Sequence, residues 1–72
     1  GGSAAATLNA ANEVAVQAFL DGHLPFMAIS KLVGDTLQAA IHSDVETLDD
    51  ILNADREARS LARTALKQWK PA

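Results

Sequence analysis

The sequence contains no cysteine, only 4% aromatic residues and no apolar run long enough to cross a bilayer. The absence of cysteine excludes a disulfide framework, a thiolate zinc site and a cysteine nucleophile. A membrane-spanning helix needs about 20 consecutive apolar residues, and the start of the chain has neither the basic segment nor the apolar stretch of a secretory signal. Apolar packing, within the chain or against a partner, must therefore hold this short polypeptide together.

Residues that favour β-strands are also scarce. The 72 residues include 15 alanines but only four valines and three isoleucines, and alanine favours helix whereas β-branched residues favour strands. A chain of this length has room for one small core. We therefore expect a single all-α domain over residues 1–72, a small bundle of three to four helices. The net charge of −3 gives no overall attraction to phosphate or anionic lipid, so neither nucleic acid nor membrane is an expected partner.

The first segment with helical periodicity covers residues 4–20. Its apolar residues recur at spacings of three and four, which places them along one side of a helix. Ser3 or Thr7 can accept the free amide hydrogens at its start. Gly22 tolerates the left-handed geometry that ends many helices, so we expect the helix to stop at Leu20.

A second helix is expected to begin between Phe26 and Ile29, because Pro25 disfavours helix at the residue before it. The helical pattern continues to Ile41. Gly34 lies inside this segment and weakens the helix relative to alanine. We expect this glycine to mark the close approach of a neighbouring helix.

Two more helical segments are expected in the second half of the chain. Thr47 and Asp50 resemble a reciprocal N-terminal cap, which would begin a short helix over residues 48–52. Asn53 or Asp55 is then expected to cap a last helix that continues almost to the end of the chain. The apolar faces of all these segments give the expected core: Leu8, Phe19, Ile29, Leu32, Val33, Leu37, Ile41, Leu48, Ile51, Leu61, Leu66 and Trp69.

Groups with catalytic potential are few. His23 and His42 flank the second helix and lie about 30 Å apart along it, too far to share a metal ion, so we expect helix-end roles for them. Six of the nine acidic residues cluster without the ligand spacing of an EF-hand and are expected at the amino termini of two helices. They are Asp44, Glu46, Asp49, Asp50, Asp55 and Glu57. The sequence predicts no catalytic, cofactor-binding or metal-binding residue.

Five of the six lysine and arginine residues fall on one side of the expected last helix, and they are Arg56, Arg59, Arg63, Lys67 and Lys70. This stripe has no interleaved aromatic residues and no nucleic-acid motif. A solvated helix face is therefore favoured over phosphate binding. Whether the stripe contacts a protein partner stays open.

Asn9, Asn12 and Glu13 are polar residues in the most apolar expected helix. Asparagine is a mediocre helix former that normally prefers caps and turns. Glu13 is expected to face water, whereas Asn9 and Asn12 lie near the side that carries Leu8 and Ala15. We expect both amides to bond a backbone outside this chain, which makes them the candidate domain-interface residues.

Residues 8–16, LNAANEVAV, followed by Ala18, Phe19 and Leu20, resemble the carboxyl-terminal helical domain of 1-deoxy-D-xylulose 5-phosphate reductoisomerase. This first block is long and specific. Shorter matches follow at the right spacing, so that the resemblance covers nearly the whole chain; they are Gly1-Gly2-Ser3, Phe26 with Ile29, residues 49–52, and Asp55 with Ala58 and Arg59. The resemblance also implies that the opening glycines are native.

The resemblance implies a larger parent enzyme. That family rearranges and reduces 1-deoxy-D-xylulose 5-phosphate to 2-C-methyl-D-erythritol 4-phosphate in the non-mevalonate isoprenoid pathway, with NADPH and a divalent metal ion, Mg²⁺ or Mn²⁺. Its cofactor-binding, metal-binding and phosphate-binding residues lie upstream, and this sequence has no glycine-rich strand-to-helix turn. What the resemblance implies here is a structural, non-catalytic domain of a cytoplasmic bacterial enzyme that forms a homodimer.

The implied partner of this chain is the catalytic domain of the parent enzyme. Without that partner, the surface meant for it would be exposed, so we expect the isolated chain to self-associate. The alternative is a stand-alone helical protein-interaction module, which a natural translation start near Gly1 would support.

Overall fold

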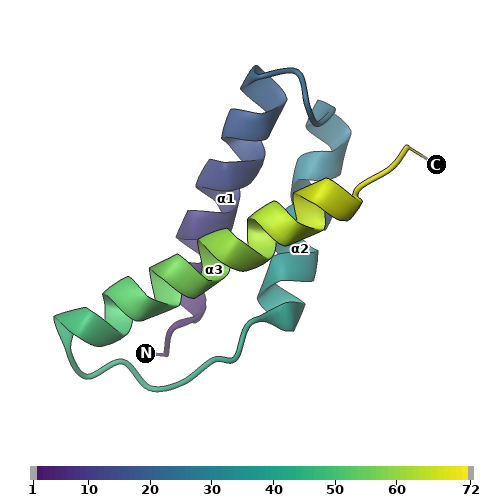
Figure 1. The fold of residues 1–72 in the computed structure, drawn as a ribbon. Coiled ribbons are helices and arrows are strands. Elements are labelled where there is room, and N and C mark those ends of the chain that lie inside the picture. The colour runs from purple at the N-terminus through teal and green to yellow at the C-terminus, as the bar shows by residue number, and fades with distance from the viewer. Residues whose placement is uncertain (1, 72) are drawn as a thin grey trace.

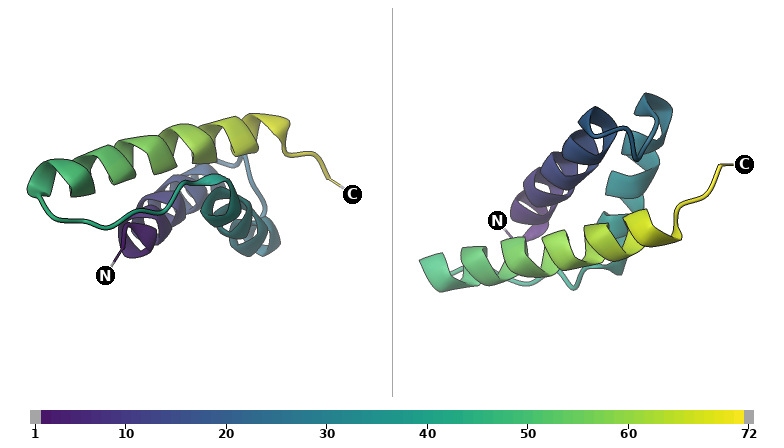
Figure 2. Two further views of the ribbon diagram at one scale, coloured as in Figure 1. Left: turned by 90° about the horizontal axis from the view of Figure 1, so that it is seen from below. Right: turned by 45° about the horizontal axis from the view of Figure 1, so that its top comes forward.

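The computed structural model describes residues 2–71, which form three α-helices and one 3₁₀ helix (Figure 1). In chain order these are α1 (Ala4–Leu20), η1 (Phe26–Ala28), α2 (Ile29–Ala39) and α3 (Leu48–Gln68). α1 and α2 run side by side in opposite directions, and α3 lies across both of them (Figure 2). The predicted small all-α bundle is confirmed.

Local chemistry ends α1 as the sequence predicts. Gly22 has a φ of 80°, a left-handed conformation that glycine adopts without a steric penalty. The backbone N–H of Gly22 donates to the Phe19 carbonyl (3.1 Å), and that of His23 donates to the Ala18 carbonyl (2.8 Å). These two bonds form a Schellman motif, which satisfies carbonyls left free by the last turn.

The start of α1 is tied to a distant part of the chain, which corrects the predicted side-chain cap. Ser3 is the N-cap of α1, but its side chain makes no capping hydrogen bond to the described residues. Its Oγ instead accepts from the Ser43 N–H (3.1 Å), and its own N–H donates to the Ser43 carbonyl (2.9 Å). A Cβ on Gly2 would lie 3.2 Å from that carbonyl oxygen, so glycine allows this close approach.

The second helical segment begins where predicted but ends earlier. η1 starts at Phe26 and leads directly into α2, which ends at Ala39 because Ala40 has an extended backbone with a ψ of 143°. Ile41 therefore lies outside the helix and is 81% exposed. The expected close approach at Gly34 is wrong, because a Cβ built there meets no atom of the described residues within 4 Å.

α3 is one continuous helix, not the two that were predicted. The predicted capping box begins it: the Asp50 N–H donates to Thr47 Oγ1 (3.1 Å) and the Thr47 N–H donates to Asp50 Oδ2 (3.0 Å). Asn53 and Asp55 lie inside the helix and cap nothing. Their side chains accept hydrogen bonds from arginines three and four residues later, a helix-surface pairing that needs no break in the backbone.

Alanine dominates the core. Of the ten hydrophobic residues buried between positions 2 and 71, seven are alanines, and the largest fully buried side chains there are Thr7 and Thr36. Thr36 is satisfied by donating from Oγ1 to the Leu32 carbonyl (2.9 Å). The buried alanines come from α1, η1 and α3, and they are Ala10, Ala11, Ala15, Ala18, Ala28, Ala58 and Ala62, whereas α2 buries Leu32, Val33 and Thr36. Small contact residues let helix axes approach closely.

The predicted core of large residues is therefore partly wrong. Leu32 and Val33 are buried as predicted, and Ile29, Leu37, Leu66 and Trp69 are partly buried against the core. Leu61 is also half-buried. Five predicted members are exposed instead, and they are Leu8, Phe19, Ile41, Leu48 and Ile51. The helices turn their alanines toward one another, which leaves these bulkier side chains outside the contact.

Enlarging a core alanine should destabilise the bundle. We expect Ala15→Leu, at a fully buried position, to lower the free energy of unfolding by about 1–3 kcal/mol through overpacking. Ala5→Leu, at an exposed position of the same helix, should change it by less than about 0.5 kcal/mol. Urea unfolding of the purified chain measures both. Equal effects of the two variants would contradict an alanine-packed core.

The capping box should weaken in acid. The backbone N–H groups of Glu46 and then Thr47 donate to the Asp50 carboxylate and lower its pKa from the ordinary value. Its stabilising effect is therefore complete above the unfolded pKa of about 3.9 and is lost as the pH falls through the lower folded pKa. Urea unfolding should show that the deficit of Asp50→Ala shrinks below about pH 4. Asp49→Ala is the control for the interaction of a carboxylate with the helix dipole. The prediction would be contradicted if Asp50→Ala lowered the free energy of unfolding by the same amount at every pH.

Candidate functional site

One face of α1 is apolar, exposed and free of charge. Seven exposed residues fall within an arc of about 120° on the helix at 100° per residue. They are Ala5, Leu8, Asn9, Asn12, Val16, Phe19 and Leu20, which we call the α1 outer face. The buried stripe of α1 points away from this arc, toward α2 and α3. The described residues cover the α1 outer face only in part, since its large side chains are between 36% (Val16) and 68% (Leu20) exposed.

Aromatic packing extends the α1 outer face beyond the helix. The rings of Phe19 and Phe26 meet edge to face with centroids 5.7 Å apart, a favoured geometry for aromatic pairs. Phe26, in η1, is nevertheless 70% exposed. The apolar surface therefore continues from the last turns of α1 onto η1.

Both predicted interface residues lie on this face. Asn9 Nδ2 lies 3.4 Å from Glu13 Oε2 in an exposed contact, a long hydrogen bond of little strength. No hydrogen bond joins the Asn12 side chain to another of the residues described. Each amide therefore retains donor and acceptor capacity for a partner, and the interface role of Asn9 and Asn12 stays a prediction.

An ion-pair cluster joins α3 to α1 where the two helices cross. Arg59 Nε donates to Asp55 Oδ2 (2.7 Å) within α3, and Arg59 Nη2 donates to Glu13 Oε2 on α1 (3.0 Å). The Asp55 bonds and then the Glu13 bond raise the pKa of Arg59 above its ordinary value. Glu13 is exposed as predicted, but it is engaged rather than free.

The basic stripe is divided by this cluster. Arg59 is half-buried in its ion pairs, whereas Arg56, Arg63, Lys67 and Lys70 are exposed, as expected of a solvated face.

The prediction for the acidic residues holds for the first turn of α3, which contains Asp49 and Asp50. It fails for Asp55 in the ion pair and for Glu57, which accepts from the Ile41 N–H (3.2 Å). These side chains link segments instead of facing a helix dipole.

The two histidines lie at opposite ends of the α2 region. His42 Nε2 lies 2.9 Å from the Leu37 carbonyl in the last turns of α2, as expected for a helix-end residue, and His23 is exposed in the turn after α1. Across positions 2–71, no three His, Asp or Glu side chains converge into a potential metal site. In the same residues, no helix is both long and apolar enough to cross a membrane.

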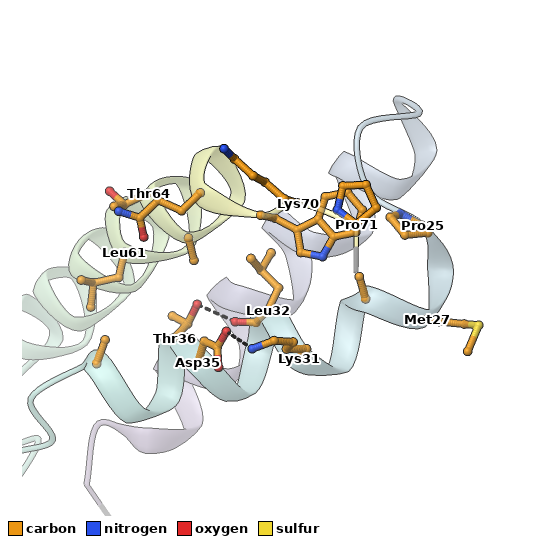
Figure 3. A pocket seen from close by; sticks show the side chains of 15 residues that line it. Pro25, Met27, Lys31, Leu32, Asp35, Thr36, Leu61, Thr64, Lys70 and Pro71 are labelled. Atoms are coloured by element: carbon orange, nitrogen blue, oxygen red, sulfur yellow. Dashed lines mark hydrogen bonds and ion pairs between the residues drawn. The ribbon is translucent and has the colours of Figure 1, made fainter.

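A shallow groove of about 900 Å³ opens between α2 and the last turns of α3 (Figure 3). Leu32, Leu61 and Trp69 line it, and the Lys31–Asp35 ion pair (3.0 Å) borders it. The sequence did not predict this groove, because it combines residues 25–39 with residues 61–71, which only the folded chain brings together. Trp69, which was predicted only as a core residue, is part of its lining.

The sequence is similar to a known protein family and to several of its members. A sequence model described as the DXP reductoisomerase C-terminal domain matches residues 1–61. The 1-deoxy-D-xylulose 5-phosphate reductoisomerase of Dechloromonas aromatica is 56% identical over 70 residues, which cover 97% of this chain and 18% of that protein. Proteins of the same name from Acidithiobacillus ferrooxidans and Pseudomonas aeruginosa are each 55% identical over 62 residues, 86% of this chain and 16% of theirs.

The chain therefore spans less than a fifth of the length of the curated relatives it matches. The match nevertheless covers most of the chain itself and includes the α1 block, so the resemblance inferred from residues 8–20 is confirmed. The chain belongs to the family of DXP reductoisomerase C-terminal domains.

Proposed function

We propose that this chain serves as the C-terminal helical domain of a 1-deoxy-D-xylulose 5-phosphate reductoisomerase. The parent would convert this substrate to 2-C-methyl-D-erythritol 4-phosphate in the cytoplasm of a bacterium, as a homodimer. The family match over residues 1–61 is the observation that carries the proposal. In this role the helices supply packing surface to the catalytic part and no reacting group.

The interactions of the polar side chains support a structural role. Asp50 is used in the capping box, Asp55 and Glu13 hold Arg59, and Glu57 binds the backbone of Ile41. Each of these carboxylates fixes one element of the bundle against another or begins a helix. These carboxylates therefore stabilise the fold.

NADPH and a divalent metal ion do not fit the residues of this chain. Between positions 2 and 71, no three potential metal ligands come together, and those residues form helices rather than the strand and glycine-rich turn that hold a dinucleotide. We therefore place both groups in the upstream part of the parent and assign no catalytic step to this domain.

Removing the domain should impair the parent enzyme. We expect the purified 72-residue chain to leave NADPH unchanged in the presence of 1-deoxy-D-xylulose 5-phosphate and Mg²⁺. The full-length parent should oxidise NADPH under the same conditions, and a parent truncated before Gly1 should lose activity and melt at a lower temperature. NADPH absorbance and thermal unfolding measure these effects. Turnover by the chain alone, or a truncated parent of full activity and stability, would refute the proposal.

The isolated chain should associate weakly with itself through the α1 outer face, because exposed apolar patches promote association. Sedimentation at increasing concentration should show a rising average mass. Val16→Asp places a charge on that face and should keep the chain monomeric, whereas Ser60→Asp, at an exposed position of α3, should not. A wild-type chain that stays monomeric throughout would contradict this expectation.

A further inference from the structure

We infer that the α1 outer face is the surface on which the upstream catalytic part of the same polypeptide packs, with the Asn12 amide bonding polar groups of that part. This inference rests on the proposed function. It goes further because it assigns one face of one helix, and not the bundle in general, to the contact. Four observations support this assignment.

The first is charge. The seven residues of the α1 outer face are uncharged, and the centres of protein interfaces are depleted in charged residues. The exposed side of α2 presents the Lys31–Asp35 ion pair, and the middle of α3 presents Arg56 and Arg63. The first turns of α3 also expose Leu48, Ile51 and Leu52, but Asp49 lies among them. The α1 outer face is thus an exposed apolar surface without a charged side chain within it.

The second is the set of groups left free on that face. The Asn12 side chain has two N–H donors and one carbonyl acceptor, and no hydrogen bond to another described residue uses them. It lies between Leu8 and Val16 along the helix, one turn from each. An amide flanked by apolar side chains can determine how a partner is oriented on this face, because burying the amide without a hydrogen-bond partner costs free energy.

The third observation concerns the point at which the upstream part of a parent would join this domain. The matched relatives are more than five times longer than the segment that this chain covers. α1 is the first helix after the start of the chain, and the bonds between Ser3 and Ser43 hold that start against the bundle. The upstream part of a parent would therefore join this domain at the amino-terminal end of α1, the helix that carries the α1 outer face.

The fourth is the size of the face. A helix of 17 residues is about 25 Å long and about 10 Å wide, so one side offers about 250 Å². A stable complex of separate chains buries about 800 Å² on each partner. A face this small is insufficient for a stable dimer, but it suffices within one polypeptide because covalent linkage raises the effective concentration. The upstream part of the same chain is therefore favoured over a second copy.

Thiol labelling tests the inference, because the domain has no cysteine of its own. Val16→Cys and Asn12→Cys place a thiol on the α1 outer face, and Ser30→Cys and Ser60→Cys place one at exposed positions of α2 and α3. Each variant is labelled with a maleimide both in the isolated chain, diluted until monomeric, and in the full-length parent. Peptide mass spectrometry separates the introduced thiol from any cysteine elsewhere in the parent.

We expect the Val16 and Asn12 thiols to react about tenfold or more slowly in the parent than in the isolated chain, because a packed interface must open before labelling. The two serine positions should react at similar rates in both proteins. Should Val16→Cys fail to fold, as judged by circular dichroism, Leu8→Cys takes its place. Equal rates in both proteins, or equal protection of all four positions, would overturn the inference.

Two further outcomes are informative. Protection that disappears when the parent is diluted would assign the face to a second subunit and would also overturn the inference. NADPH oxidation is followed in the same samples: fast labelling in an active parent refutes the α1 contact alone, whereas a folded wild-type parent without reductoisomerase activity refutes the proposed function.

Discussion

The packing of small alanine side chains where α3 crosses α1 is the interaction on which this fold depends. A helix that presents alanines can approach its neighbours closely, and fully buried Ala11, Ala15 and Ala62 show that the approach is achieved. Alanine packing contributes little hydrophobic free energy to folding, because each buried methylene is worth about 0.8 kcal/mol and alanine has only one methyl group. A small domain packed in this way has little stability to spare and benefits from a larger body beside it.

Polar contacts add orientation to the close helix packing that the alanines allow. Small contact surfaces alone do not fix the rotation of one helix on another, because they offer few interdigitating side chains. Arg59 supplies that information by bridging Asp55 on its own helix to Glu13 on α1. The Ser3 and Ser43 bonds attach the start of α1 to the segment between α2 and α3. The orientation of the α1 outer face follows from these two attachments.

Helix limits could be predicted from the sequence wherever local chemistry decides them. The stop at Gly22 and the start at Thr47 depend on atoms within a few residues, and both were correct. The extra cap at Asn53 or Asp55 was wrong because the same side chains can either cap a helix or pair with an arginine one turn later. In the structure Asn53 pairs with Arg56, and Asp55 pairs with Arg59, which also binds Glu13 on α1.

The core could be predicted only in part, for a related reason. Helical periodicity identifies an apolar side, but α1 is apolar around most of its surface, so periodicity did not reveal which side faces inward. Leu8 and Phe19 were assigned to the core by their helical spacing, and the structure buries the neighbouring alanines there instead. Asn9 and Asn12 were predicted as interface residues because their polarity contrasts with their neighbours; the structure places both on the α1 outer face, and their interface role stays a prediction.

Trp69 gives this domain an internal optical reporter. It is the single tryptophan of the chain and is partly buried where the last turn of α3 meets the rim of the groove. Its fluorescence will therefore follow the docking of that turn, while far-ultraviolet ellipticity follows helix content as a whole. A mismatch between the two signals during melting would show the carboxyl end of α3 detaching before the remaining helices unfold.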